Sequence, residues 1–179
     1  DYAYFARDYI PLLSAGSKGR RRAYILSHEE RVDRIGAVLA RLYPDELPEG
    51  TSIAWYFRSN NAPYHTLKTS TLEIQSYDLQ EHPSYLAQKL QHQQPYLIIA
   101  PASILLRILS LIMEGRLELE RCSRVYNSGE VMTARDRLAL RRQFATVGDI
   151  YQGVEGMLGV TCAHGRQHLC EEKYLIEKE

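Results

Sequence analysis

Short apolar stretches alternate along this chain with longer stretches in which apolar residues recur at helical spacing. The short stretches predict strands at residues 23–26, 52–57, 69–77, 96–100, 122–126 and 149–151, and a final pair of strands at 157–161 and 174–176. The helical spacing predicts helices at residues 1–10, 83–90, 101–115 and 133–144, and one that runs from a Ser27 cap to about residue 42.

The order of these elements favours an α/β fold. Strands that alternate with helices are typical of βαβ units, in which consecutive strands lie parallel. The run YLIIA at 96–100 is apolar at almost every position, as in strands covered on both faces. We therefore expect a three-layer domain with a mixed, mainly parallel β-sheet.

Composition narrows the class of protein. With 179 residues, 45% hydrophobic and 25% charged, the chain fits one globular domain rather than a disordered segment. The 22 basic and 22 acidic residues balance, which argues against a nucleic-acid module that binds through bulk positive charge. Pro101, Ser103 and Arg107 interrupt the longest apolar run, so no membrane span is expected. The charged N-terminus does not resemble a signal peptide, and three cysteines favour a reducing compartment, so we expect a cytoplasmic protein.

Two loops contain residues that could bind a nucleotide. Residues 14–22 (SAGSKGRRR) combine small residues, hydroxyls and cations, which suit phosphate oxygens, but they lack the Walker spacing. Residues 127–130 (NSGE) follow a predicted strand, and loops at the carboxyl ends of parallel strands line ligand crevices. An ordinary surface turn and a helix-capping turn are the respective alternatives, and each is favoured when its loop is considered alone.

Two further motifs could hold a metal. In residues 151–156 (YQGVEG), an aromatic ring suited to stacking on a base precedes glycines and a carboxylate suited to a divalent cation. The alternative is a strand end followed by a turn. Cys162, His164, His168 and Cys170 are soft ligands at compact spacing, which suggests zinc, although ordinary packing is the favoured alternative. Cys122 lies in an apolar stretch and is expected in the core. The hydrolase motifs G-x-S-x-G and H-E-x-x-H are absent.

Taken in order, these segments resemble adenylate-forming enzymes of the branch that contains phenylacetate–CoA ligase, the coenzyme F420 adenylating enzymes and their capsule-cluster relatives. Residues 149–179 (DIYQGVEGMLGVTCAHGRQHLCEEKYLIEKE) carry the most specific likeness, to a segment written YQ-x-TEG…C-x-HG-x-LHL-x-ED. RVYNSGEVM (124–132) resembles the adenine loop, and QPYLIIAPASILLRIL (94–109) resembles the strand and helix beside the acyl pocket. Residues 13–41 resemble the phosphate loop and the helix after it.

The resemblance implies that ATP activates a carboxylic acid to an acyl adenylate, with later transfer to coenzyme A or a carrier thiol. It implies that Tyr151 stacks on adenine beside Gln152 and that Glu155 holds Mg²⁺ as the catalytic metal ligand. The remaining nucleotide-binding residues would be Ser128, Gly129 and Glu130 at the adenine edge and Ser14, Gly16, Ser17 and Gly19 around the phosphates. Cys162 and His168 match positions that join a structural zinc in some relatives. The acid pocket is expected near residues 55–61 and 100–103.

The sequence also departs from this family. Val154 stands where the family has threonine, which removes a hydroxyl donor, and Ala15 and Lys18 alter the phosphate loop. Family enzymes are far longer, so residues 1–179 are expected to form a single truncated adenylation core of the large N-terminal domain. The ribose-binding Asp, the hinge and the mobile C-terminal subdomain with its catalytic Lys would then be missing. We expect weak ATP binding without turnover.

Two alternatives remain open at the level of sequence. In the first, the chain is a non-catalytic relative that acts as a binding or scaffold subunit with a partner chain; separately, the open strand edges of an incomplete domain lead us to expect a homodimer or a partner chain. In the second, it is an unrelated α/β domain whose Cys/His cluster binds zinc. Whether the chain is itself an enzyme is not decided by its sequence.

Overall fold

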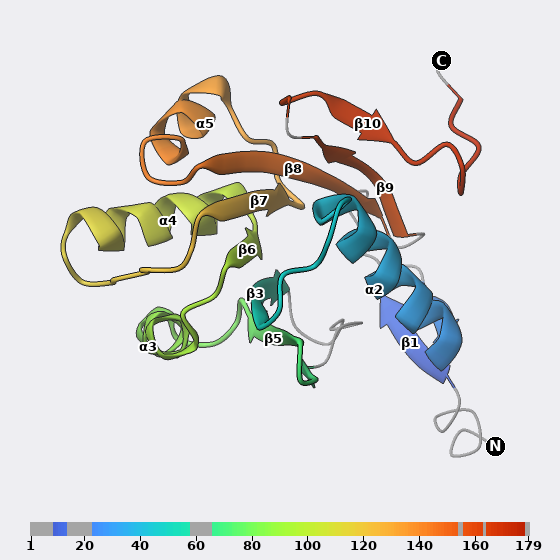
Figure 1. Ribbon diagram of the computed structural model, residues 1–179, viewed down its shortest axis with the longest axis horizontal. Helices are drawn as coiled ribbons and strands as arrows, with labels where there is room; N and C mark the ends of the chain where they lie inside the picture. Colours follow the sequence, from blue (N-terminus) through green and yellow to red (C-terminus); the bar gives the residue numbers. More distant parts are fainter. Residues whose placement is uncertain (1–8, 14–22, 58–65, 154–155, 163, 178–179) are drawn as a thin grey trace.

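The computed structural model describes residues 9–13, 23–57, 66–153, 156–162 and 164–177 (Figure 1). Their strands are β1 (Tyr9–Leu13), β2 (Ala23–Ser27), β3 (Thr51–Phe57), β4 (Leu67–Lys68), β5 (Leu72–Asp78), β6 (Leu97–Ala100), β7 (Arg124–Ser128), β8 (Thr146–Gly153), β9 (Gly156–Thr161) and β10 (Gln167–Leu169). Their helices are α2 (His28–Leu42), α3 (Pro83–Gln93), α4 (Ala102–Met113) and α5 (Ala134–Leu140).

The main sheet has the strand order β10-β9-β8-β7-β6-β3-β5-β4. The central strands β5, β3, β6, β7 and β8 run parallel to one another. The outer strands β4, β9 and β10 pair antiparallel with their neighbours. The predicted mixed, mainly parallel sheet is therefore confirmed. Strands β1 and β2 form a separate antiparallel pair.

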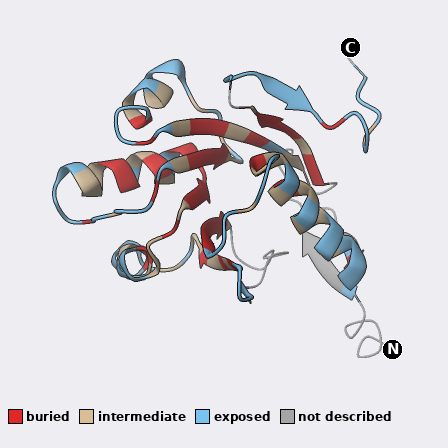
Figure 2. Cartoon of the chain, viewed as in Figure 1, coloured by how far each residue is buried: buried red, intermediate tan, exposed pale blue. Residues whose placement is uncertain are grey.

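Helices cover both faces of the sheet, which gives three layers (Figure 1). One core cluster joins α3, α4 and α5 to the sheet through residues such as Leu90, Leu105 and Leu140. The other cluster joins α2 to the opposite face through Val38 and Leu42. The buried positions follow the central strands (Figure 2). None of the helices in the described part of the chain combines the length and hydrophobicity needed to cross a lipid bilayer.

A capping box explains where α2 begins. The Glu30 backbone N–H donates to the Ser27 hydroxyl (3.1 Å), and the Ser27 backbone N–H donates to the Glu30 carboxylate (2.7 Å). These reciprocal bonds satisfy donors that the first turn of a helix leaves unpaired. Hydrogen bonding to Ser27 lowers the pKa of the Glu30 carboxyl. The Ser27 backbone N–H is the larger cause and the Ser27 side chain is the smaller one.

Gly148 is required by its neighbour across the β7–β8 pair. Its backbone lies opposite Tyr126, and a Cβ at this position would be 2.5 Å from the Tyr126 ring. The missing side chain lets the ring pack closely against β8, and Tyr126 is only 3% exposed.

Several predictions about the elements need correction. Helix α5 ends at Leu140 rather than at residue 144, and β8 begins at Thr146 rather than at residue 149. Residues 9 and 10 belong to β1 rather than to a helix, because Tyr9–Leu13 pairs with Ala23–Ser27. Residues 174–176 form no strand, and the partner of β9 is instead Gln167–Leu169. Strand β7 spans Arg124–Ser128 and so ends two residues later than predicted, which places Asn127 and Ser128 in the sheet. Residues 1–8 lie outside the described residues.

Candidate functional site

The parallel strands bring three strand ends to one edge of the sheet. Strands β6, β7 and β8 end there at Ala100, Ser128 and Gly153. Ser128 pairs with Ile150, so Tyr151 lies one residue beyond it on the adjacent strand. The structure thus places the predicted loop 128–130 beside the predicted aromatic residue.

Tyr151 is accessible at this edge. Its side chain is 59% exposed, which is unusual among the described aromatic residues of the central strands. On its other side Tyr151 pairs with Gly159 of β9, and a register shift follows between Tyr151 and Gln152. The half-buried Gln152 then pairs with Met157. An exposed ring on a rigid strand can stack on a flat ligand.

The loop after β7 turns sharply at Gly129. Its φ of 86° lies in the left-handed region, which favours glycine, and nothing lies within 4 Å of the position of a Cβ. The backbone at Gly129 can therefore be approached closely from outside.

The Glu130 carboxylate is directed toward α4. It accepts a hydrogen bond from the Ser103 backbone N–H (2.9 Å) and another from the Ser103 hydroxyl (3.0 Å). Pro101, the N-cap residue of α4, offers no side-chain cap, so Glu130 satisfies donors of the first turn of this helix. A contact between Glu130 and an adenine edge stays a prediction.

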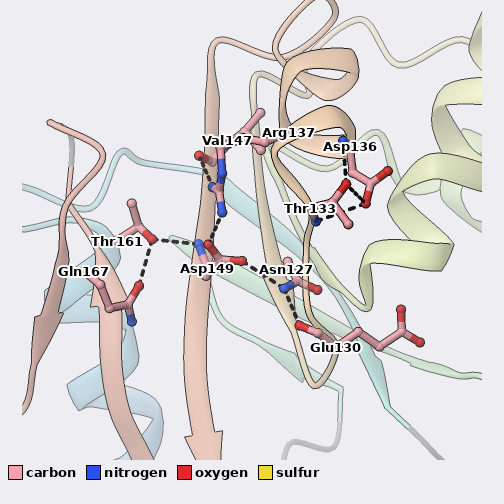
Figure 3. Close-up of polar contacts among 9 residues, drawn as sticks. All are labelled: Asn127, Glu130, Thr133, Asp136, Arg137, Val147, Asp149, Thr161 and Gln167. Atoms are coloured by element: carbon pink, nitrogen blue, oxygen red, sulfur yellow. Dashed lines mark hydrogen bonds and ion pairs between the residues drawn. The ribbon is translucent and has the colours of Figure 1, made fainter.

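A polar cluster lies directly beneath this loop (Figure 3). The Asn127 amide nitrogen donates to the Glu130 backbone carbonyl (2.7 Å) and to Asp149 Oδ1 (2.9 Å). Asp149 Oδ2 forms an ion pair with Arg137 of α5. The Asp149 backbone N–H donates to the Thr161 hydroxyl (2.9 Å).

The cluster contains an acceptor without a partner. Asn127 is 3% exposed, and its Oδ1 is buried with no hydrogen-bond partner among the residues that the structure describes. The Thr161 hydroxyl, in contrast, donates to Gln167 Oε1 (3.0 Å). Arg31 Nε, Tyr43 Oη and Glu81 Oε2 are also buried without a hydrogen-bond partner among the described residues, so an unpaired atom does not by itself mark the site.

Sequence reasoning did not identify Arg137, Asp149, Thr161 and Gln167 as members of the site, and it treated Asn127 only as part of a loop. The sequence offers only a partial signal, because Asn127, Asp149 and Thr161 are polar residues next to apolar ones in strands β7, β8 and β9. That Asn127 and Asp149 share a face follows from their pairing across β7 and β8, which the structure supplies.

Several predicted site residues lie outside the described residues. These are the phosphate-loop residues Ser14, Gly16, Ser17 and Gly19 and the metal ligand Glu155. Their roles stay predictions.

The zinc prediction finds no support. The described residues contain no group of three or more His, Cys, Asp or Glu side chains that could hold a metal. His168 lies exposed on β10, and the backbone N–H of Cys162 donates to Arg166 within the β9–β10 connection. Cys122 is 8% exposed in the core, as predicted, and burial raises the pKa of its thiol to about 12.

A separate cavity of about 790 Å³ lies between α3 and α4. Aliphatic side chains such as Leu86 and Ile108 line it together with Tyr56, and Arg107 and Glu81 add charge. Apart from Tyr56, which falls in the stretch expected near an acid pocket, none of the predicted site residues lines it.

Solved structures share this fold. VinN matches with a TM-score of 0.61 and 15% identity over 86% of this chain and 39% of that chain. A 2-hydroxyisobutyryl-CoA ligase, solved with 2-HIB-AMP and CoA, matches with a TM-score of 0.66 and 11% identity over 87% of this chain and 39% of that chain. A fatty acyl-adenylate ligase from L. pneumophila, solved with acyl adenylate and pyrophosphate, matches with a TM-score of 0.59 and 12% identity over 84% of this chain and 30% of that chain.

These matches establish the fold class. The chain has the α/β fold of part of the ligases that were solved with acyl adenylates. It spans well under half the length of each of these solved chains. No protein-family model matches the sequence, and a search of curated proteins finds no match either.

Proposed function

We propose that this chain is the nucleotide-binding core of an enzyme that activates a carboxylic acid with ATP. In this reaction a carboxylate oxygen attacks the α-phosphorus, the bond to the β-phosphate oxygen breaks, and acyl adenylate and pyrophosphate form. The observation that carries the proposal is the juxtaposition of the Ser128–Gly129 loop with the exposed Tyr151 ring at the carboxyl edge. Ligands of open α/β sheets bind at this edge.

The chemistry of the edge suits a nucleoside. Tyr151 offers a face for the adenine ring, and the open backbone at Gly129 offers hydrogen-bonding groups for its rim. Ser14, Gly16, Ser17 and Gly19 would cradle the phosphates with backbone N–H groups and hydroxyls. This assignment to residues 14–19 rests on the sequence.

Mg²⁺ would be held by Glu155 together with phosphate oxygens. Magnesium prefers oxygen ligands and is commonly held by one or two carboxylates plus phosphates, so a dedicated cage of acidic residues is not required. Bound there, the ion would neutralise charge on the phosphates. The described residues supply no alternative acidic cluster for it.

We further propose that residues 1–179 bind ATP weakly and do not complete the reaction alone. Supporting this, the chain covers 39% or less of each ligase structure named above, and Val154 lacks the hydroxyl that the resemblance leads one to expect. The acyl adenylate would be consumed by a thiol, either of coenzyme A or of a carrier.

Calorimetric titration with ATP, with and without Mg²⁺, tests the proposal. Tyr151→Ala should weaken binding by about 1–3 kcal/mol, the contribution of one stacked base. Glu155→Gln should remove the Mg²⁺ dependence while leaving metal-free binding intact. The matched controls are Tyr85→Ala on α3, where the tyrosine is similarly exposed at 52%, and Glu49→Gln. Absence of binding at millimolar ATP, or equal losses in Tyr85→Ala, would contradict the proposal.

A non-catalytic binding subunit is the second candidate function. Val131 beside the loop is 91% exposed and Leu138 on α5 is 61% exposed, which leaves apolar side chains available to another chain. Light scattering across a concentration series tests this candidate. A mass that doubles with concentration and falls to that of a monomer in Leu138→Lys supports it, whereas a monomer at every concentration argues against a second copy as the partner.

A further inference from the structure

Asn127 connects the two walls of the proposed base site. Its amide nitrogen carries only two hydrogens, and both are used, one on the Glu130 backbone carbonyl and one on Asp149 Oδ1. Because both partners are acceptors, the amide cannot be flipped without losing these bonds. The orientation that they impose leaves Asn127 Oδ1 buried without a partner among the described residues.

Asp149 is itself fixed from three sides. Oδ1 accepts from Asn127, Oδ2 pairs with Arg137, and the backbone N–H donates to the Thr161 hydroxyl. The side chains of Arg137 and Asp149 are 25% and 28% exposed, so solvent screens their attraction only in part. Arg137 also donates to the Val147 backbone carbonyl (3.4 Å). Helix α5 therefore holds β8 at the residue two positions before Tyr151.

Glu130 is fixed in the same way at the other wall. Its backbone carbonyl is held by Asn127, and its carboxylate is held by Ser103 at the start of α4. Ser128 and Gly129 lie in the chain between Asn127 and Glu130, both of which these hydrogen bonds hold in place. A single side chain, Asn127, thus links the Gly129 turn to the strand that carries Tyr151 (Figure 3).

We propose that Asn127 and Arg137 are positioning residues that set the width of the slot between the Gly129 turn and the Tyr151 ring. The inference rests on the proposed nucleotide site. Neither residue is assigned a contact with the ligand. They act through Glu130 and Asp149, which the Asn127 amide nitrogen and the Arg137 guanidinium hold in place.

The experiment compares three probes: ATP, AMP and inorganic tripolyphosphate. Arg137→Met and Asn127→Ala should weaken AMP and ATP by about tenfold, within the range that one base-stacking contact contributes. Tripolyphosphate binding should stay within about twofold, because its phosphates do not enter the slot. Arg137→Lys, which keeps the charge opposite Asp149, should restore part of the AMP affinity. Thermal unfolding of each variant shows whether it is folded under the titration conditions.

Hydrogen exchange gives a readout that does not depend on nucleotide. Amides of residues 128–131 should exchange faster in Asn127→Ala than in the unaltered chain, and those of α2 should not change. Equal weakening of tripolyphosphate and AMP, or an unchanged AMP affinity, would overturn the positioning role. If the unaltered chain binds neither ATP nor AMP, both the proposed function and the positioning role are rejected. If the unaltered chain binds AMP but the variants bind it equally well, only the positioning role is rejected.

Discussion

The carboxyl edge of β7 and β8 and the cavity between α3 and α4 are built in opposite ways. At the edge, side chains from two strands and α5 converge on Asn127 and Asp149 through hydrogen bonds of defined direction. The cavity, of about 790 Å³, is lined by aliphatic side chains together with polar and charged ones from α3, α4 and the segments beside them. The edge therefore offers polar groups that hold one another in fixed directions, whereas the cavity offers a mixed apolar and polar wall between two helices.

The largest expected effect is a difference in the free energy of unfolding between a substitution in the core and one in the cavity wall. Leu105 of α4 is fully buried, so Leu105→Ala should lower the free energy of unfolding by about 3 kcal/mol. Leu111 lines the cavity and is only partly buried, so Leu111→Ala should cost about 1 kcal/mol. Urea unfolding measures both values. Equal costs would show that the cavity wall is packed as tightly as the core.

Filling the cavity should leave the edge unaffected. Ala87→Phe places a ring in the cavity, so binding of an apolar fluorescent dye should fall several-fold while ATP affinity stays unchanged. Ala87→Ser is the control, because it keeps the space open. A parallel loss of ATP affinity in Ala87→Phe would mean that the two regions form one site.

Helices α2 and α5 each begin with a capping box, and removing each box in turn tests how far the carboxyl edge depends on α5. Thr133→Ala at α5 and Ser27→Ala at α2 should each cost about 1 kcal/mol of stability. Only Thr133→Ala should also lower ATP affinity, by a small factor, because α5 carries Arg137 and α2 covers the opposite face. Titration and urea unfolding of both variants give the comparison, and equal effects on ATP would contradict it.

The smallest expected effect is a pH dependence of α5. Hydrogen bonds from the Thr133 hydroxyl and then its backbone N–H hold the pKa of Asp136 below its ordinary value of 3.8. A carboxyl with a lowered folded-state pKa stabilises the fold above its unfolded-state pKa, and this contribution is lost as the pH falls through the folded value.

The stability difference between the unaltered chain and Asp136→Asn should therefore be full at neutral pH and vanish well below pH 3.8. Urea unfolding across pH measures it. The control Asp33→Asn removes an exposed carboxylate that belongs to neither capping box. A difference that persists undiminished in acid would contradict the assignment.

Local signals were sufficient for most of the fold. The Ser27 cap, the glutamates after it and the apolar spacing all predict α2, and each acts within a few residues. The apolar run 97–100 has the pattern of a central strand and becomes β6. Strand β10 was missed because Gln167–Leu169 is exposed at every position, and pairing with β9 alone makes it a strand.

The site was harder to predict than the fold. That loop 128–130 adjoins Tyr151 follows from parallel order, which the sequence pattern predicts. The pairing of Asn127 with Asp149 depends on the exact register of β7 against β8, which no local signal gives. The link from Arg137 to Asp149 depends in addition on how α5 docks.

The close contact between Tyr126 and Gly148 carries a consequence for how this protein can change over evolutionary time. Any side chain at position 148 meets the ring, so substitutions there are tolerated only after residue 126 has become smaller. The two positions should therefore vary together among descendants of this sequence. A lineage that keeps the ring inherits the glycine, and one that loses it still has the Thr161 Cβ 3.2 Å from any Cβ at position 148, so a third position joins the pair.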